Sequence, residues 1–115
     1  MTNNRTVGTR YEILAADYLR SKGYEILDMN YHTRFAELDI IALNEDALVF
    51  VEVKYRRSTK QGYPSEAVDF RKQGRIRKAS VFYMTEKGYS IDDTFIRYDI
   101  ISILGKDLEH LENAF

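Results

Sequence analysis

Two stretches of the sequence carry apolar side chains at helical spacing. In the first, residues 7–22, apolar positions recur at i, i+3, i+4, i+7 and i+8, which is typical of an amphipathic helix, and Gly23 is expected to end it. The second stretch lies between Ser65 and Gly88. Ser65 or Asp69 is expected to cap the N-terminus of this helix, and Gly88 is expected to end it. The pattern therefore predicts two helices, each of which buries one face.

Four other stretches have the pattern of strands, at residues 24–30, 36–43, 48–53 and 95–103. The third is an almost unbroken run of β-branched and aromatic residues, which is typical of a strand covered on both faces. The first three have short connections and should form an antiparallel meander. The helix between the third and fourth predicts a crossover to a parallel neighbour.

The fold class that these elements predict is α/β, with a mixed central sheet built in the order helix, three strands, helix, strand. A chain of 115 residues is long enough for one such domain and too short for two. We expect a single domain over residues 1–115, with its core at about 7–104. The acidic tail at 105–115 has Leu108 and Leu111 at helical spacing, so we expect a short helical fragment there.

Composition excludes several kinds of chemistry. The chain has no cysteine and two histidines, His32 and His110, which rules out thiol catalysis, cysteine-based zinc sites and a three-histidine zinc site. No apolar run reaches membrane-spanning length, and residues 1–5 lack the apolar stretch of a signal peptide. We therefore expect a cytoplasmic protein with no membrane association.

The net charge of −1 conceals an uneven distribution of charge. Residues 54–78 contain nine basic and two acidic side chains, so this segment carries +7 and the rest of the chain −8. A local basic segment points to a polyanionic partner such as DNA. The alternative is a solvated helix face together with a lysine-rich loop, and the charge pattern alone leaves both open.

Carboxylates and a lysine alternate along two neighbouring predicted strands. Glu37 and Asp39 share one face of the second strand, and Glu52 and Lys54 share one face of the third. If Leu43 and Leu48 close the hairpin, Asp39 lies opposite Glu52 and Glu37 opposite Lys54. A slip of two residues would instead pair Asp39 with Lys54 in an ordinary salt bridge, which leaves no reason for a metal.

Two carboxylates that face each other across a sheet destabilise it unless something neutralises them. A divalent cation with hard oxygen ligands would do so, and Mg²⁺ typically binds one or two carboxylates beside substrate phosphate. Lys54 would then project toward the same place and orient or deprotonate a water. Glu12, on the first helix, is either solvated or a third carboxylate over the sheet edge.

The series Asp39 with Glu52-Val53-Lys54 resembles the signature of the restriction-endonuclease-like PD-(D/E)XK superfamily. More closely, residues 8–103 are similar to the bacterial YraN-like proteins, which are themselves similar to archaeal Holliday junction resolvases. The shared residues, as they stand in this sequence, are Glu12-x-x-Ala15-x-x-Tyr18-Leu19, Gly23-Tyr24-x-Ile26-Leu27, Glu37-x-Asp39, Val49-Phe50-Val51-Glu52-Val53-Lys54, Pro64-x-Glu66-Ala67-Val68 and Lys72-x-x-Arg75-Ile76.

The resemblance implies a restriction-endonuclease-like core and a metal site. It implies that Asp39, Glu52 and the Val53 carbonyl bind Mg²⁺, for which Mn²⁺ can substitute, with Glu12 close by and Lys54 as the catalytic lysine. This chain departs from its relatives at three positions. Tyr11 and Ala36 stand where relatives usually have glycine, and Tyr55 stands where they often have threonine.

These observations lead us to expect a metal-dependent endonuclease that binds DNA, including branched DNA, and hydrolyses a phosphodiester. A homodimer is compatible with this function. The alternatives are a non-catalytic nucleic-acid-binding module of the same fold and a protein-interaction domain. Tyr55 and Tyr63 either stack on bases or anchor the loop. The expected site residues are Glu12, Asp39, Glu52 and Lys54 for catalysis, Glu37 as an outer-shell group, and Arg56, Arg57, Lys60, Lys72 and Arg75 for nucleic-acid binding.

Overall fold

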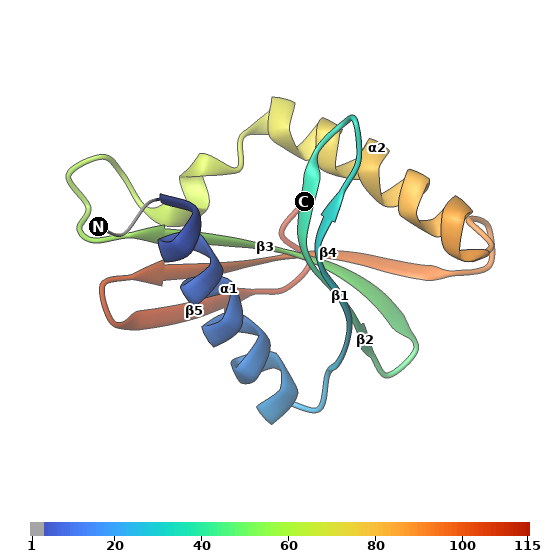
Figure 1. The fold of residues 1–115 in the computed structure, drawn as a ribbon, viewed down its shortest axis with the longest axis horizontal. Coiled ribbons are helices and arrows are strands. Elements are labelled where there is room, and N and C mark those ends of the chain that lie inside the picture. The colour runs from blue at the N-terminus through green and yellow to red at the C-terminus, as the bar shows by residue number, and fades with distance from the viewer. Residues whose placement is uncertain (1–3) are drawn as a thin grey trace.

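A five-stranded mixed sheet with the strand order β1-β2-β3-β4-β5 forms the centre of the computed structural model, which describes residues 4–115 (Figure 1). Residues 1–3, which belong to the stretch predicted to lack a signal peptide, lie outside the described residues. The elements are α1 (Asn4–Ser21), β1 (Glu25–His32), β2 (Glu37–Asn44), β3 (Ala47–Arg56), the 3-10 helix η1 (Pro64–Ala67), α2 (Phe70–Lys87), β4 (Phe95–Leu104) and β5 (Asp107–Leu111).

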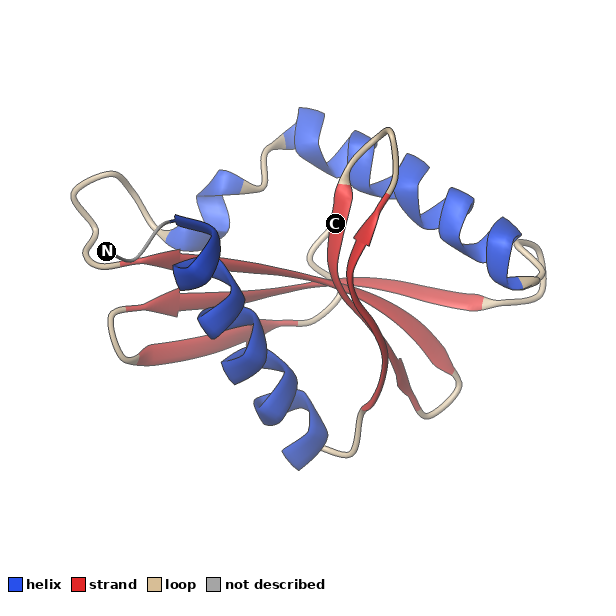
Figure 2. Cartoon of the chain, in the orientation of Figure 1, coloured by secondary structure: helices blue, strands red, loops and turns tan. Residues whose placement is uncertain are grey.

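The two helices lie on opposite faces of the sheet and each seals its own hydrophobic core (Figure 2). Ala15, Ala16 and Leu19 of α1 pack on one face, while Ile76 and Ala79 of α2 pack on the other. Because both faces are covered, Ala47–Val51 at the start of β3 is fully buried, as its apolar run predicts. None of the helices within residues 4–115 is long and apolar enough to span a membrane.

The predicted order of the first six elements and their pairing are confirmed. β1, β2 and β3 form an antiparallel meander, and β4 lies parallel to β3 after the α2 crossover. Asp69 is the N-cap of α2, because its side chain accepts a hydrogen bond from the Lys72 backbone N–H at 2.9 Å. Gly88 ends the helix with a φ of 81°, a left-handed conformation that glycine adopts without steric cost.

The predicted register of the β2–β3 hairpin is also confirmed. Leu43 pairs with Leu48 and Ile40 with Val51, so the alternative slip that would pair Asp39 with Lys54 is excluded. The connection is tighter than predicted, since Asn44 and Ala47 pair with each other and leave only Glu45 and Asp46 in the turn. The register is unchanged, because the extra pair extends the same ladder.

The predicted helical fragment in the tail is wrong. Asp107–Leu111 forms β5, which pairs antiparallel with β4 from Leu104–Asp107 to Ile100–Leu111. Gly105, with a φ of 60°, allows a two-residue turn that sends the chain straight back along β4. Leu108 and Leu111 then pack on different hydrophobic cores, so their spacing reflects two sheet faces and not one helix face.

Candidate active site

The carboxylates of Asp39 and Glu52 meet where β2 and β3 stop pairing through their backbones. The last ladder pair is Ile40 with Val51, and beyond it Asp39 Oδ2 accepts a hydrogen bond from the Val53 N–H at 2.8 Å. Glu52 Oε2 lies 3.4 Å from the Asp39 backbone nitrogen. Because the N–H and C=O of one strand residue point to the same side, the Val53 carbonyl also faces this junction.

Glu12 reaches the same junction from α1. It lies close enough to Asp39 for the two carboxyl groups to share a hydrogen bond. The Asn30 side-chain amide lies against Glu12 from β1, with its nitrogen 2.9 and 3.0 Å from the two carboxylate oxygens in the orientation that lets it donate. Asn30 has a φ of 54°, a conformation that asparagine tolerates better than most residues. Three carboxyl groups from three elements therefore converge.

A cleft of about 280 Å³ opens beside these carboxylates and has basic side chains on its other wall. Glu37, Asp39, Glu52 and Lys54 line it from the sheet. From α2 and the β1–β2 turn come Lys72, Arg75, Ile76, Phe35 and Ala36. Acidic and basic groups thus face one another across a space that is large enough for a phosphate group.

Burial and mutual repulsion hold the site carboxyls toward their neutral forms. Burial raises the pKa of Glu52 well above its usual range, and the charge of Asp39 adds to this effect. Burial also raises the pKa of Asp39, although the Val53 N–H opposes it. Burial and then Asp39 raise the pKa of Glu12 to about 7. Among the side chains described, residues 9–115, no lysine or arginine nitrogen lies within 4 Å of these carboxylates.

The two lysines of the cleft lie close together. Lys54 is the main cause of a lowered pKa at Lys72, through its charge, and burial adds to this. Charge repulsion therefore exists between Lys54 of the sheet and Lys72 of α2, as it does between Asp39 and Glu52. An anion bound between the lysines and a cation bound between the carboxylates would relieve both.

The departures at Tyr11 and Tyr55 meet in the fold. Their rings are stacked, with centroids 3.8 Å apart and planes 12° from parallel. Tyr11 belongs to α1 and Tyr55 to β3, so the pair joins the helix to the strand just beyond Lys54. Tyr55 thus uses one face of its ring within the protein, which favours the anchor interpretation for it, whereas Tyr63 is exposed.

The predicted DNA-binding residues fall into two groups. Lys72 and Arg75 line the cleft with the carboxylates. Arg56, Arg57 and Lys60 line a separate hollow of about 240 Å³ in the loop after β3, together with Ser58 and Gln61. Glu37 lines the cleft, and its Oε1 lies 3.6 Å from His32 Nε2. The structure therefore brings together Glu12, Glu37, Asp39, Glu52, Lys54, Lys72 and Arg75 at one site.

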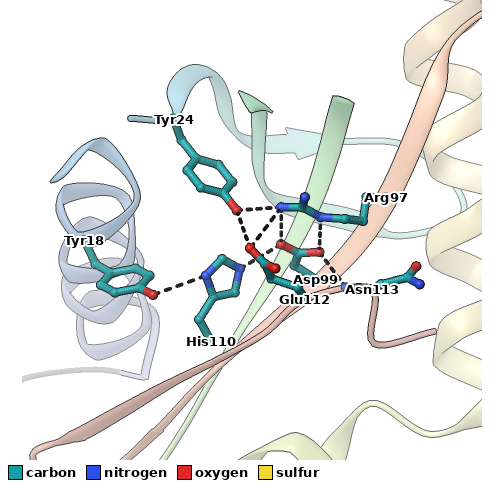
Figure 3. Close-up of polar contacts among 7 residues, drawn as sticks. All are labelled: Tyr18, Tyr24, Arg97, Asp99, His110, Glu112 and Asn113. Carbon is teal, nitrogen blue, oxygen red and sulfur yellow. Dashed lines mark hydrogen bonds and ion pairs between the residues drawn. The ribbon is translucent and has the colours of Figure 1, made fainter. Parts of the chain in front are cut away.

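A second buried carboxylate, Asp99 on β4, has a different environment (Figure 3). Arg97 donates to both of its oxygens, at 2.9 and 3.0 Å, and His110 Nε2 lies 2.7 Å from Oδ2. The Asn113 N–H donates to Oδ1 at 3.0 Å. Burial alone would raise the pKa of Asp99, but these hydrogen bonds from His110, Arg97 and Asn113 outweigh it and lower the pKa.

Asp99, His110 and Glu112 offer ligand atoms within 4.8 Å of one another, a spacing that a metal ion could bridge. The Arg97 guanidinium already occupies that position, since it binds Asp99 and lies 3.7 Å from Glu112 (Figure 3). We therefore assign this cluster a structural role. The comparison is informative, because Asp99 has a cationic partner in the protein and Glu52 has none within 4 Å among the side chains described.

Comparison with known proteins gives the family. The model of the uncharacterised protein family UPF0102 matches residues 11–103. The chain belongs to this family. A UPF0102 protein of Syntrophomonas wolfei is 47% identical to this UPF0102 chain, in an alignment that covers 97% of this chain and 99% of the relative. One from Alkaliphilus oremlandii has the same identity and coverage, and one from Thermodesulfovibrio yellowstonii is 43% identical over 95% of both chains.

Membership of UPF0102 supports the resemblance to YraN-like proteins that the sequence motifs indicate. The relatives' names state no activity, so the link to nucleases stays a prediction. The matched residues, 11–103, include every side chain at the cleft of this UPF0102 protein.

Removing one site charge should stabilise the metal-free protein. In chelator near neutral pH, Glu52→Gln is expected to raise the free energy of unfolding by about 1 kcal/mol, because the raised pKa of the buried Glu52 carboxyl costs stability that a neutral amide does not. Asp39→Asn should be neutral or stabilising, since its remaining oxygen still accepts from the Val53 N–H. Urea unfolding with EDTA measures both. The matched control is Asp99→Asn, which should destabilise, and a similar loss in all three variants would contradict the prediction.

Stability in chelator should also fall as the pH rises. The folded pKa of Glu12, at about 7, lies above its unfolded value, so the folded state binds more protons between the two values. The stabilisation is fully present below the unfolded pKa, near 4.5, and is lost as the pH passes 7. Urea titrations from pH 4.5 to 8 should show this decline, and Glu12→Gln should show a shallower one. Equal slopes for the two proteins would contradict the assignment.

Proposed function

We propose that this protein is a metal-dependent nuclease with a restriction-endonuclease-like core that binds DNA, including branched DNA, and hydrolyses a phosphodiester bond. The observation that carries the proposal is the convergence of Glu12, Asp39 and Glu52 beside a cleft whose opposite wall is basic, with no lysine or arginine nitrogen of the described side chains within 4 Å of these carboxylates. The alternative in which Asp39 pairs with Lys54 would have removed the reason for a metal, and the register excludes it.

The donor set fits a hard divalent cation. Carboxylate oxygens, together with the Val53 carbonyl, are the ligands that Mg²⁺ and Mn²⁺ prefer, and none of the described side chains that line the cleft offers sulfur or imidazole. When bound there, such an ion supplies Lewis-acid stabilisation of charge on the phosphate and makes a water more acidic. Asp39 and Glu52 would hold it from the sheet and Glu12 from α1. Glu37, at the cleft mouth, would act on the outer shell.

The remaining side chains have roles that follow from their place in the cleft. The Lys54 Nζ, two residues after Glu52 on the same strand face, would orient or deprotonate the attacking water. Lys72 and Arg75 would bind the non-bridging phosphate oxygens from the α2 side. In this arrangement the phosphate lies between the acidic and basic walls, so that binding neutralises the basic side while the carboxylates stay free for the cation.

A nuclease panel tests the proposal. Labelled duplex, single-stranded, flapped and four-way-junction DNA is incubated with EDTA, Mg²⁺ or Mn²⁺ and the products are resolved on denaturing gels. We expect cleavage with either metal, none in EDTA, and none by Glu52→Gln under any condition. Absence of cleavage by wild type across all metals and substrates, with DNA binding retained, would overturn catalysis in favour of the non-catalytic nucleic-acid-binding module.

The salt dependence of DNA binding should report the basic wall. Each phosphate contact contributes a slope of about −0.9 in a plot of log affinity against log salt on duplex DNA. Lys72→Ala or Arg75→Ala should therefore reduce the slope by about one and weaken all sequences alike. Lys22→Ala, directly after the C-terminus of α1 and outside the lining of the cleft, is the matched control and should leave the slope unchanged. Equal slopes in all four proteins would remove these side chains from the DNA interface.

A further inference from the structure

A second hollow, of about 520 Å³, lies between α2 and the turn that joins β1 to β2. Figure 1 shows this turn reaching up beside α2. Phe35 and Phe82 supply aromatic surface, Val81 adds an aliphatic one, and Arg34, Arg77 and Lys78 supply positive charge. We call this hollow the aromatic groove. None of the described side chains that line it is acidic.

Local hydrogen bonds hold the turn side of the aromatic groove in place. Thr33 Oγ1 accepts from the backbone N–H groups of Phe35 and Ala36, each at 3.1 Å, and the Thr33 N–H donates to the Ala36 carbonyl. Phe35 is thereby fixed with part of its ring against the α2-side core. The Arg34 guanidinium lies 5.0 Å from the centre of the same ring. This side of the groove is therefore formed before any ligand binds.

The helix side presents an apolar and a basic row. Arg77 and Val81 are four residues apart on α2, as are Lys78 and Phe82, so each cation lies one turn before an apolar neighbour. Val81 and Phe82 are each 42% exposed, because α2 buries its other apolar face in the core and these two side chains lie on the outer side. Together with Phe35 they form a contiguous exposed apolar patch rimmed by polar side chains, which is typical of a binding surface.

The aromatic groove adjoins the candidate active site. Phe35 lines both hollows, and Arg75 and Ile76 of the cleft directly precede Arg77 and Lys78 of the groove on α2. A ligand that extends out of the cleft along α2 would therefore pass onto Phe35 and Phe82. Positive charge without acidic groups selects an anion, and flat aromatic surface beside it suits a ligand that carries both phosphates and planar rings.

We propose that the aromatic groove binds unpaired nucleotides of the DNA next to the phosphate in the cleft. The substrate class is then DNA in which a single-stranded segment joins a duplex, as at a flap or an unpaired branch point. This inference rests on the proposed function. Bases stack on Phe35 and Phe82, while Arg34, Arg77 and Lys78 bind the backbone of the unpaired strand. A fully paired duplex cannot present base faces and would use only the cleft.

Binding of tailed and fully paired DNA tests the proposal. Fluorescence anisotropy is measured in EDTA, where cleavage cannot interfere, with a labelled duplex that carries a six-nucleotide 5′ or 3′ tail and with a blunt duplex of the same total charge. We expect wild type to prefer one tailed duplex by about tenfold, the effect of stacking one base. Phe82→Ala should lose this preference and keep its affinity for blunt DNA, and Phe82→Tyr should restore the preference.

The matched control is Phe95→Ala, since Phe95 is 68% exposed on β4 and lies outside the aromatic groove. It should behave as wild type, and thermal melting confirms that each variant folds. Equal affinity of wild type for tailed and blunt DNA, or an unchanged preference in Phe82→Ala, would overturn the groove assignment while metal-dependent cleavage of DNA still stands. If wild type neither binds nor cleaves any of these DNA substrates, the proposed function itself would be overturned. Direct binding of labelled poly-glutamate to wild type more tightly than the tailed duplex, lost in Phe82→Ala, would assign the groove to an acidic peptide and overturn the proposal.

Discussion

Lys54→Ala is expected to abolish DNA cleavage while most DNA binding remains. Lys54 lines the cleft beside Glu52, and its proposed interaction is with the attacking water, which strengthens only in the transition state. Loss of a general base or a water-positioning group typically lowers the rate by about 10²–10⁴-fold. Lys72 and Arg75 keep their phosphate contacts in the variant, so the affinity should change little. Single-turnover cleavage and anisotropy on the same substrate measure the two effects separately.

The matched control for Lys54 is Lys72→Ala, because the two ammonium groups lie close together in the same cleft. Lys72→Ala should weaken binding and leave the single-turnover rate at saturating DNA within a few fold. Losses of binding and cleavage in equal proportion in Lys54→Ala would show that Lys54 is another phosphate contact. A normal rate in Lys54→Ala would place the catalytic group elsewhere.

Asp99→Ala should lower the free energy of unfolding more than any other single carboxylate substitution, whether at the candidate active site or at the Asp99 cluster. The change leaves the Arg97 guanidinium and His110 without their buried anionic partner, a loss that typically costs about 3–5 kcal/mol. A domain of this size is stable by about 5–15 kcal/mol, so the variant should be close to unfolding at physiological temperature. Urea unfolding and thermal melting measure the effect. If Asp99→Ala does not fold, the milder Asp99→Asn allows the loss of unfolding free energy to be measured instead.

The double variant Arg97→Met with Asp99→Leu separates the cost of an unpaired buried charge from the cost of lost packing. Replacing both charges by apolar side chains removes the desolvation cost of each, so the double variant should recover much of the loss in Asp99→Ala. Glu52→Ala provides the contrast, because that carboxylate has no ion-pair partner among the described side chains and its loss strands no charge. A loss of less than about 1 kcal/mol in Asp99→Ala would contradict the structural role of the Asp99 cluster.

Elements governed by local pattern could be predicted from the sequence. The helical spacing before Gly23 and the apolar run of β3 each dictate one element, and the short Asn44–Ala47 connection fixes the β2–β3 register. The register in turn places Asp39 beside Glu52 and the Val53 backbone. β5 escaped prediction because Leu108 and Leu111 fit a helical spacing, and only the turn at Gly105 distinguishes the two structures.

Features that depend on long-range packing could not be predicted. Asn30 meets Glu12 through contacts between β1 and α1. The stacked pair Tyr11 and Tyr55 joins residues far apart in the chain, and neither sequence position alone signals the other. Asp99 and His110 occupy ordinary alternating positions on β4 and β5, so only their burial together shows that they form a cluster. The aromatic groove likewise requires Phe35 and Phe82 to meet across two elements.

Calorimetric titration of the protein with Mn²⁺ tests the central claim, that the carboxylates at the β2–β3 junction hold a divalent cation. Wild type should bind Mn²⁺ with a measurable heat that competition by Mg²⁺ reduces. Asp39→Ala and Glu52→Gln should lose this binding, and Asp99→Asn, with its substitution at the Arg97-paired carboxylate, should keep it at a temperature where it is folded. Absence of Mn²⁺ binding by wild type, or undiminished binding by Asp39→Ala and Glu52→Gln, would contradict the account.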